Sequence, residues 1–181
     1  MVQRYLYTLL IAAGCLIGAT GCFSPTSLAD NTPTDDAGSD SGKCLTAEDA
    51  VRLADRVLEL VNLERAGEGL APVLENPTLT KLAEDYACRM IDEGFFDHYD
   101  PLTGAGPAER ALQQDYVFLA IGENLAAGQQ TPAEVMEVWM QSPSHRAIIL
   151  DPKWEEVGVA VRSGGSYAIY WVQEFGVPHE E

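Results

Sequence analysis

Basic residues are scarce in this chain. It contains 11 Lys and Arg against 28 Asp and Glu in 181 residues, which gives a formal net charge of -17 at pH 7. Binding to nucleic-acid phosphates or to anionic lipid requires clustered Lys and Arg. The composition therefore argues against a nucleic-acid partner and against electrostatic attachment to a membrane. With 46% hydrophobic residues, the chain can still bury the core of one ordinary domain.

Two enzyme and metal-site patterns are also missing. The four cysteines, at positions 15, 22, 44 and 88, show no C-x-x-C spacing, which excludes a thioredoxin-type motif and a zinc ribbon. The sequence has no Gly-x-Ser-x-Gly elbow, and this disfavours a serine hydrolase of that type. Imidazole chemistry depends on three His, at positions 98, 145 and 179, of which the last lies in an acidic tail and is expected to be solvated.

The N-terminus indicates export. Arg4 is followed by an apolar run from Tyr5 to Ala19 that is too short for a good transmembrane helix. The run ends in Ala19-Thr20-Gly21-Cys22, which resembles a bacterial lipobox. We therefore predict a lipoprotein signal peptide over 1–21, with Cys22 lipidated and anchored in the membrane. An ordinary cleaved signal without lipid is the alternative.

The next segment, 22–43, is predicted to be a disordered acidic tether. Pro, Ser, Thr, Asp and Gly dominate it, and it has too few large apolar side chains to offset the entropy of ordering. Phe23 rather than Asp follows Cys22, so the signal for inner-membrane retention is absent. We expect a cell-envelope lipoprotein at the outer membrane or cell surface, with its folded domain over 44–181.

Two cysteines remain in that domain after processing. Cys44 and Cys88 are expected to form a disulfide, because paired cysteines in exported domains are usually oxidised. Two buried free thiols are the alternative. In the chain-entropy account, such a cross-link stabilises a domain by on the order of 4 kcal/mol.

Hydrophobic periodicity predicts helices first and paired strands last. This order is typical of an α+β fold with an antiparallel sheet. The predicted helices cover 46–66, with a capping box formed by Thr46 and Asp49, then 76–94, 107–113, 131–141 and 144–150. The predicted strands cover 116–121, 157–161 and 167–175, the last two joined as a hairpin by Gly164-Gly165.

Three residues are candidates for a site. His98 follows the end of a predicted helix, His145 lies at a helix break, and Glu123 is a carboxylate within an apolar stretch. A buried carboxylate needs polar partners, and imidazoles are suitable ones. Spacing alone is also compatible with two surface histidines and one structural glutamate.

Several motifs resemble a known family when they are taken in order. They are VNLER at 61–65, FDH at 96–98, GENLAAG at 122–128, VWMQSPSHRAIIL at 138–150, VGV at 157–159 and WVQEFG at 171–176. Together they resemble the SCP-like or CAP superfamily of cysteine-rich secretory proteins, antigen 5 and pathogenesis-related proteins, in its short bacterial branch. The resemblance implies a three-layer α-β-α sandwich around a central antiparallel sheet, with a surface cleft.

The resemblance also implies which residues line this cleft. Eukaryotic members have two His and two Glu there, and by motif His98, Glu123 and His145 match three of the four. The fourth position falls on Ser142, so this carboxylate is missing. Glu137 would point elsewhere on the helix and is a poor substitute.

These side chains could act in more than one way. His98, His145 and Glu123 suit zinc or another divalent cation with one position left open. Without metal, Glu123 could fix a histidine tautomer and act as a base. A hydrogen-bond network with no catalytic role is the alternative. Ser142 and Ser144 neighbour His145, but sequence neighbours rarely form a nucleophile–base pair.

We therefore expect a non-enzymatic binding module whose cleft takes a metal, a lipid, a wall fragment or a protein. A metal-assisted hydrolase that acts on peptide or envelope polymer is the alternative, with Glu123 as base or metal ligand. A scaffold within a surface assembly is the third. Fold alone does not choose among these hypotheses.

Overall fold

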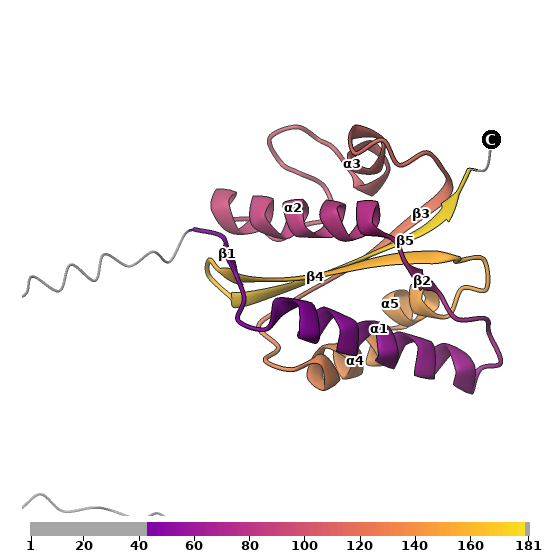
Figure 1. Cartoon of the computed structure of the whole chain (residues 1–181). Coiled ribbons are helices and arrows are strands. Elements are labelled where there is room, and N and C mark those ends of the chain that lie inside the picture. Colours follow the sequence, from indigo (N-terminus) through magenta and orange to yellow (C-terminus); the bar gives the residue numbers. More distant parts are fainter. Residues whose placement is uncertain (1–42, 180–181) are drawn as a thin grey trace, which may run out of the picture. The chain divides into compact units, whose positions relative to one another are not determined.

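The computed structural model describes residues 43–179, shown in Figure 1. The predicted signal peptide, the lipidation of Cys22 and the tether up to residue 42 lie outside this range. No helix within 43–179 is long and apolar enough to cross a membrane. The elements in chain order are β1 (Leu45–Thr46), α1 (Ala50–Gly67), β2 (Leu74–Glu75), α2 (Pro77–Glu93), α3 (Pro107–Gln113), β3 (Phe118–Ala127), α4 (Pro132–Gln141), α5 (Pro143–Ile149), β4 (Glu156–Gly164) and β5 (Ala168–Pro178).

The strands form one sheet in the order β1-β4-β5-β3, and β2 runs parallel to the start of β4. β4 and β5 form the predicted antiparallel hairpin, in which Val157 lies opposite Phe175 and Val161 opposite Trp171. β3 pairs antiparallel with β5 and is an outer strand. The predicted α+β class with a mainly antiparallel sheet is confirmed.

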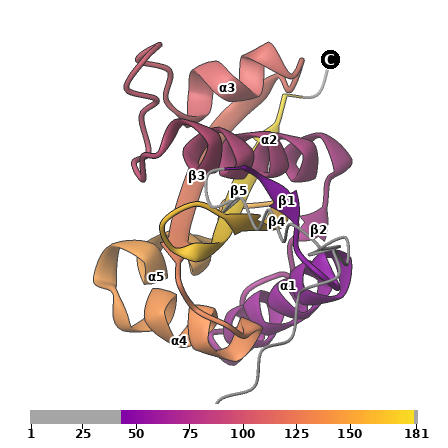
Figure 2. The ribbon, with the colours of Figure 1, turned by 90° about the vertical axis from the view of Figure 1, so that its left-hand side faces the viewer.

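Helices cover both faces of this sheet and produce three layers (Figure 2). On one face, α2 packs against Ala160 and Val172. On the other, α1 and α4 pack around Trp139 and Trp171. β4 is therefore buried continuously from Val157 to Val161 instead of on alternate residues. The α-β-α sandwich that the family resemblance implies is confirmed.

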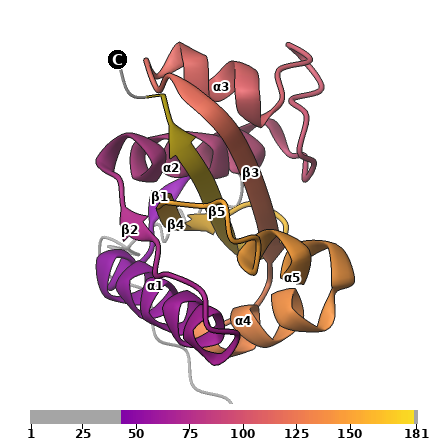
Figure 3. The same ribbon diagram turned by 90° about the vertical axis from the view of Figure 1, so that its right-hand side faces the viewer.

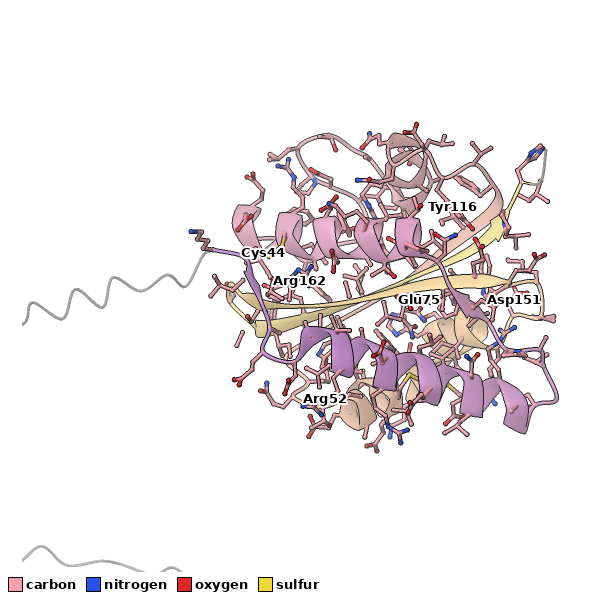
Figure 4. The ribbon with its side chains drawn as sticks, viewed as in Figure 1. Cys44, Arg52, Glu75, Tyr116, Asp151 and Arg162 are labelled. Atoms are coloured by element: carbon pink, nitrogen blue, oxygen red, sulfur yellow. A yellow bond between two sulfur atoms is a disulfide. The ribbon has the colours of Figure 1, made fainter. Side chains whose placement is uncertain are left out.

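The contact of α2 with β4 depends on a glycine. A Cβ atom at Gly158 would lie 2.1 Å from the backbone of Leu79, in the first turn of α2. Asn76 caps this helix as predicted, because its side-chain oxygen accepts two backbone N–H groups of the first turn. Cys88 on the same helix forms the expected disulfide with Cys44, which Figure 4 shows beside α2.

The predicted start of the first helix is wrong. α1 begins at Ala50, because Thr46 pairs with Arg162 in the short strand β1. Asp49 precedes the helix in a left-handed conformation, with φ at 59°, and no side chain caps the first turn. A capping-box pattern was present, but strand pairing with β4 determined the structure there.

One further expectation needs correction. β3 extends to Ala127, beyond the predicted end at Ile121, because the polar Glu123 and Asn124 lie inside the strand with their side chains buried. On the next helix, α4, the residues that pack in the core are Val135, Met136 and Trp139.

Candidate functional site

The candidate site straddles β3 at the edge of the sheet. Consecutive strand residues point to opposite faces, so Glu123 and Asn124 belong to different faces. Strand register places Glu174 opposite Glu123 and Gln173 opposite Asn124. Each face of the β3–β5 pair therefore carries two buried polar side chains. Figure 3 shows α2 and α3 on one side of β3, and α4 and α5 on the other.

Glu123 is the centre of the α2 face. Its side chain is 1% exposed; Oε1 lies 2.7 Å from His98 Nδ1, and Oε2 accepts a hydrogen bond from Arg110 Nη2 at 2.5 Å. Both oxygens of this buried carboxylate are therefore engaged by cationic groups or groups that can become cationic. The predicted meeting of His98 with Glu123 occurs in the structure.

His98 belongs to the loop between α2 and α3 and is partly open to solvent. Its side chain is 45% exposed. The hydrogen bond to Glu123 raises the pKa of His98 above its ordinary value of 6.5, against the opposing effect of burial. The imidazole is therefore biased toward the charged form, and its outer side is open to solvent.

Arg110 from α3 holds this half of the site together. Its Nη1 donates to the backbone oxygens of His98 and Ala105, at 2.8 and 3.1 Å. Its guanidinium carbon lies 3.3 Å from the centre of the Tyr86 ring on α2. One cation therefore fixes the loop that carries His98 and also orients Glu123.

Glu174 on β5 adds a second carboxyl group that the sequence analysis did not identify. It is completely buried, and both of its oxygens lack a hydrogen-bond partner among residues 43–179. Its Oε1 lies 3.7 Å from Arg110 Nη2. Burial, followed by the neighbouring charge of Glu123, raises the pKa of Glu174 well above its ordinary value of 4.5. The protonated form of Glu174 is therefore favoured more than in an exposed carboxyl group.

His145 lies on the opposite face, in the first turn of α5. Asn124 Nδ2 donates to Gln173 Oε1 at 3.1 Å and to the backbone oxygen of His145 at 3.4 Å. The Nδ1 atom of His145 is buried without a partner among the described residues. Burial lowers the pKa of His145 below 6.5, and the charge of His98 lowers it further. The ring of His145 is therefore biased toward the neutral form.

Ser142 contributes less than its position suggested. It ends α4 and begins α5. Its hydroxyl lies 3.1 Å from the hydroxyl of Ser144, and this is its side-chain hydrogen bond within 43–179. Neither serine is bonded to His145, so this part of the chain forms no serine–histidine pair. Glu137 is exposed and bonds to Gln141, in keeping with its rejection as the missing carboxylate.

A three-ligand zinc site does not fit the arrangement as it stands. Within residues 43–179, no cluster of three or more His, Cys, Asp and Glu side chains is placed to hold a metal ion. Glu123 is committed to Arg110 and His98, and a buried guanidinium beside a metal ion would be repelled by it. Coordination by Glu123 would first require its separation from Arg110. Metal binding by His98, His145 and Glu123 remains a prediction.

Arg110 and Glu174 are the functional residues that sequence reasoning missed. Arg110 lies on a short amphipathic helix, where a basic residue is ordinarily solvated, and only the packing of α3 against α2 and β3 buries it. For Glu174 a signal existed: a carboxylate interrupts the apolar strand YWVQEF. The register with Glu123, which brings the two carboxyl groups together, is a tertiary property.

Comparison with known proteins identifies the family. A sequence model of the cysteine-rich secretory protein family, abbreviated CAP, matches residues 58–175, more than half of the chain. This chain belongs to the CAP family. The matched segment contains every cleft residue named above. In this CAP domain, Glu174 on β5 brings a second carboxyl group near Arg110.

Two bacterial relatives of this CAP chain have no characterised role. The uncharacterised protein YkwD of Bacillus subtilis is 38% identical over 120 residues, which are 66% of this chain and 45% of YkwD. An uncharacterised protein of Borreliella burgdorferi is 30% identical over 81 residues, or 45% of this chain and 50% of that protein. The matches thus span about half the length of these relatives.

Solved structures show the same CAP fold. An outer surface protein of Borrelia burgdorferi superposes with a TM-score of 0.67 at 22% identity, over 76% of this chain and 99% of that one. An extracellular protein of Bacillus anthracis that contains an SCP domain gives 0.64 at 23% identity, over 71% of this chain and 41% of that one. At these identities the similarity establishes the fold alone.

Proposed function

We propose that this protein is an exported, lipid-anchored envelope protein whose CAP domain binds a ligand in a cleft at the β3 edge without converting it. Three observations support the location. They are the lipobox-like end of the apolar run at Cys22, the disulfide between Cys44 and Cys88, and two structural relatives described as an outer surface protein and an extracellular protein. The absence of Asp after Cys22 favours the outer membrane or the cell surface.

The engagement of Glu123 is the observation that carries the binding role. A general base must have a lone pair free to take a proton from substrate or water. In this chain Arg110 and His98 contact both carboxylate oxygens of Glu123, and burial raises the pKa of Glu174 and favours its protonated form. These contacts hold one wall of the proposed cleft in place and leave the exposed edge of His98 open to a ligand.

The raised pKa of His98 favours its charged form, which would bind ligands with hydrogen-bond acceptors. Wall fragments, lipid headgroups and peptide surfaces all carry them. Among these we favour a wall fragment, because a lipid-anchored domain on a tether would lie within reach of the wall. The titrations described next distinguish a wall fragment from a lipid or a protein as the ligand.

The proposal is tested by titrating the isotope-labelled full chain with soluble peptidoglycan fragments. We expect the ring signals of His98 and His145 to shift while the fragments stay intact by mass spectrometry. Matched titrations with phosphatidylglycerol vesicles separate a lipid headgroup from a wall ligand. An unchanged spectrum with both probes would contradict a small-ligand cleft and leave a protein partner.

A metal-assisted hydrolase is the second candidate, supported by the buried, unpartnered Nδ1 of His145 close to His98. It predicts that peptidoglycan fragments or peptides are cleaved in the presence of zinc. His145→Ala would then abolish turnover without a change in the circular dichroism spectrum. Turnover of this kind would replace the binding proposal.

A further inference from the structure

A cavity lies on the far side of the loop that carries His98. Its volume is about 410 Å³, within the range that holds small ligands. α2 and α3 form two of its walls and the intervening loop forms a third; Figure 2 shows these three segments together. Leu82 and Tyr86 provide apolar surface. Four charged side chains also line it: Asp85, Arg89, Asp100 and Arg110.

Arg89 is a fixed cation with a replaceable partner. Its Nε donates to Asp100 at 2.9 Å, and the side chain of Asp100 is 7% exposed, so a buried group sets the position of the guanidinium. Its Nη1 pairs with Glu93, but these two side chains are 35% and 40% exposed. An exposed pair of this kind contributes little to stability. A ligand carboxylate can therefore take the place of Glu93.

Asp85 lies one turn before Arg89 on α2 and supplies a negative charge to the cavity in the same way. Its Oδ2 accepts a hydrogen bond from Gln114 of α3 at 3.0 Å, which positions the carboxylate. Its other oxygen meets Lys81 in an ion pair whose side chains are 57% and 45% exposed. A ligand ammonium group can therefore take the place of Lys81, just as a ligand carboxylate can take the place of Glu93.

These two groups carry the opposite charges that the two ends of a short zwitterion require. Asp85 and Arg89 are four residues apart on one helix face, and such positions have Cβ atoms about 6 Å apart. The four charged lining groups cancel in sign, so the cavity disfavours a ligand with a large net charge of either sign. A guanidinium binds a carboxylate through two parallel hydrogen bonds, and a carboxylate binds an ammonium group.

We propose that this cavity is a binding site for a zwitterionic amino acid or dipeptide, with the ligand carboxylate on Arg89 and the ligand ammonium on Asp85. An apolar ligand side chain packs against Leu82 and Tyr86. This site is distinct from the cleft at β3. Arg110 connects the two, because it lines the cavity and also binds Glu123.

The test uses the full chain in detergent and three probes: L-alanyl-L-alanine, D-alanyl-D-alanine and N-acetyl-L-alanyl-L-alanine. We expect a free dipeptide to shift the amide signals of Arg89, Ala105 and Gln114. Arg89→Gln and Asp85→Asn should each weaken binding about tenfold, the loss of one charge-assisted contact. Arg56→Gln removes an exposed pair with Glu59 on α1 and is the matched control, with unchanged affinity.

The acetylated probe sharpens the assignment because it has no ammonium group. It should bind more weakly than the free dipeptide, lose nothing further with Asp85→Asn, and lose about tenfold with Arg89→Gln. Asp85→Asn leaves the pair between Arg89 and Asp100 intact, so it remains informative if Arg89→Gln disturbs the loop. A preference for the D-isomer indicates a free D-amino-acid dipeptide as the ligand, and a preference for the L-isomer an ordinary dipeptide.

Two results would overturn the site. One is the absence of shifts at the cavity amides with either free dipeptide at concentrations well above millimolar. The other is wild-type affinity in folded Arg89→Gln and Asp85→Asn variants.

Discussion

On the α2 face of β3, His98 shares Glu123 with Arg110 and is biased toward the cation. On the opposite face, the Nδ1 atom of His145 is buried without a described partner, and the ring is biased toward the neutral form. The two rings contribute to one strand edge, and adjacent residues of β3 set their surroundings. Neighbouring carboxylates stabilise a charged imidazole, and desolvation without a partner disfavours it.

This difference shows how a short segment can build an asymmetric cleft. The α2 face combines two buried carboxyl groups, one of them with a raised pKa, with one guanidinium and one partly exposed imidazole. The α5 face combines neutral amides with one neutral imidazole. A ligand that bridges the edge therefore meets a cationic donor on one side and an uncharged ring on the other.

The largest expected effect comes from removing the cation of the α2 face. Arg110→Ala leaves Glu123 and Glu174 buried together without their guanidinium, which should lower the free energy of unfolding by about 3–5 kcal/mol. Denaturant unfolding measures this change. Arg146→Ala is the matched control, because its pair with Glu68 is exposed on both sides, and it should cost less than about 1 kcal/mol. Equal small losses in both variants would show that Arg110 is not a buried structural cation.

The raised pKa of Glu174, on the same face, predicts the second largest effect, which is a dependence of the free energy of unfolding on pH. The pKa of Glu174 is raised on folding, so the folded state holds a proton that the unfolded state releases above pH 4.5. Stability should therefore fall as pH rises from 4.5 toward the folded-state pKa, by up to about 1.4 kcal/mol per pH unit for one proton.

Glu174→Gln removes this titration and should flatten that part of the stability curve, so that the variant gains on the wild type as pH increases. Unfolding curves at several pH values test it. Glu137→Gln, at an exposed position on α4, should leave the slope unchanged. A wild-type slope in Glu174→Gln would mean that Glu174 is already ionised in the folded protein.

The pKa values of His98 and His145 give a smaller effect, which tests the difference between the two faces of β3 directly. In a proton NMR titration, His98 should titrate above 6.5 and His145 below it. The contact of protonated His98 with Glu123 stabilises the folded state fully below pH 6.5. This stabilisation is lost as the pH rises through the raised pKa of His98. Glu123→Gln should bring the His98 midpoint down toward 6.5, since the hydrogen bond to Glu123 is the largest cause of the increase. An unchanged midpoint would contradict that contact.

The smallest expected effect tests whether both rings share one cleft. Removing the charge of His98 with His98→Ala should raise the pKa of His145 slightly, because burial, the larger cause, remains. The same titration measures it, and His179→Ala in the C-terminal segment is the control. If the His145 midpoint does not move, the two imidazoles are too far apart to bind one ligand together.

Local sequence signals predicted much of the architecture. Asn76 and Thr131 begin α2 and α4 as expected, because a side-chain cap acts within one helical turn. The hairpin of β4 and β5 followed from alternating valines and a Gly-Gly turn. The start of α1 was missed because strand pairing between Thr46 and Arg162 competes with a local capping pattern.

Within the site, residue types identified His98, Glu123 and His145, but not what surrounds each of them. His98 and Glu123 were paired correctly as imidazole and buried carboxylate. Arg110 could not be found in the same way, since its burial depends on how α3 packs against Tyr86 and β3. Glu174 was visible as a charged residue in an apolar strand, but not as a neighbour of Glu123.

The amino-acid sequence by itself determined the order of the longer helices and strands, the disulfide partners and the family, because these depend on local patterns and on residue identity. Tertiary structure decided the protonation bias of the two histidines, the raised pKa of Glu174 and the commitment of Glu123 to Arg110. Those properties depend on desolvation and on charges a few ångströms away, and the relevant neighbours are brought together by strand register and helix packing across distant parts of the chain.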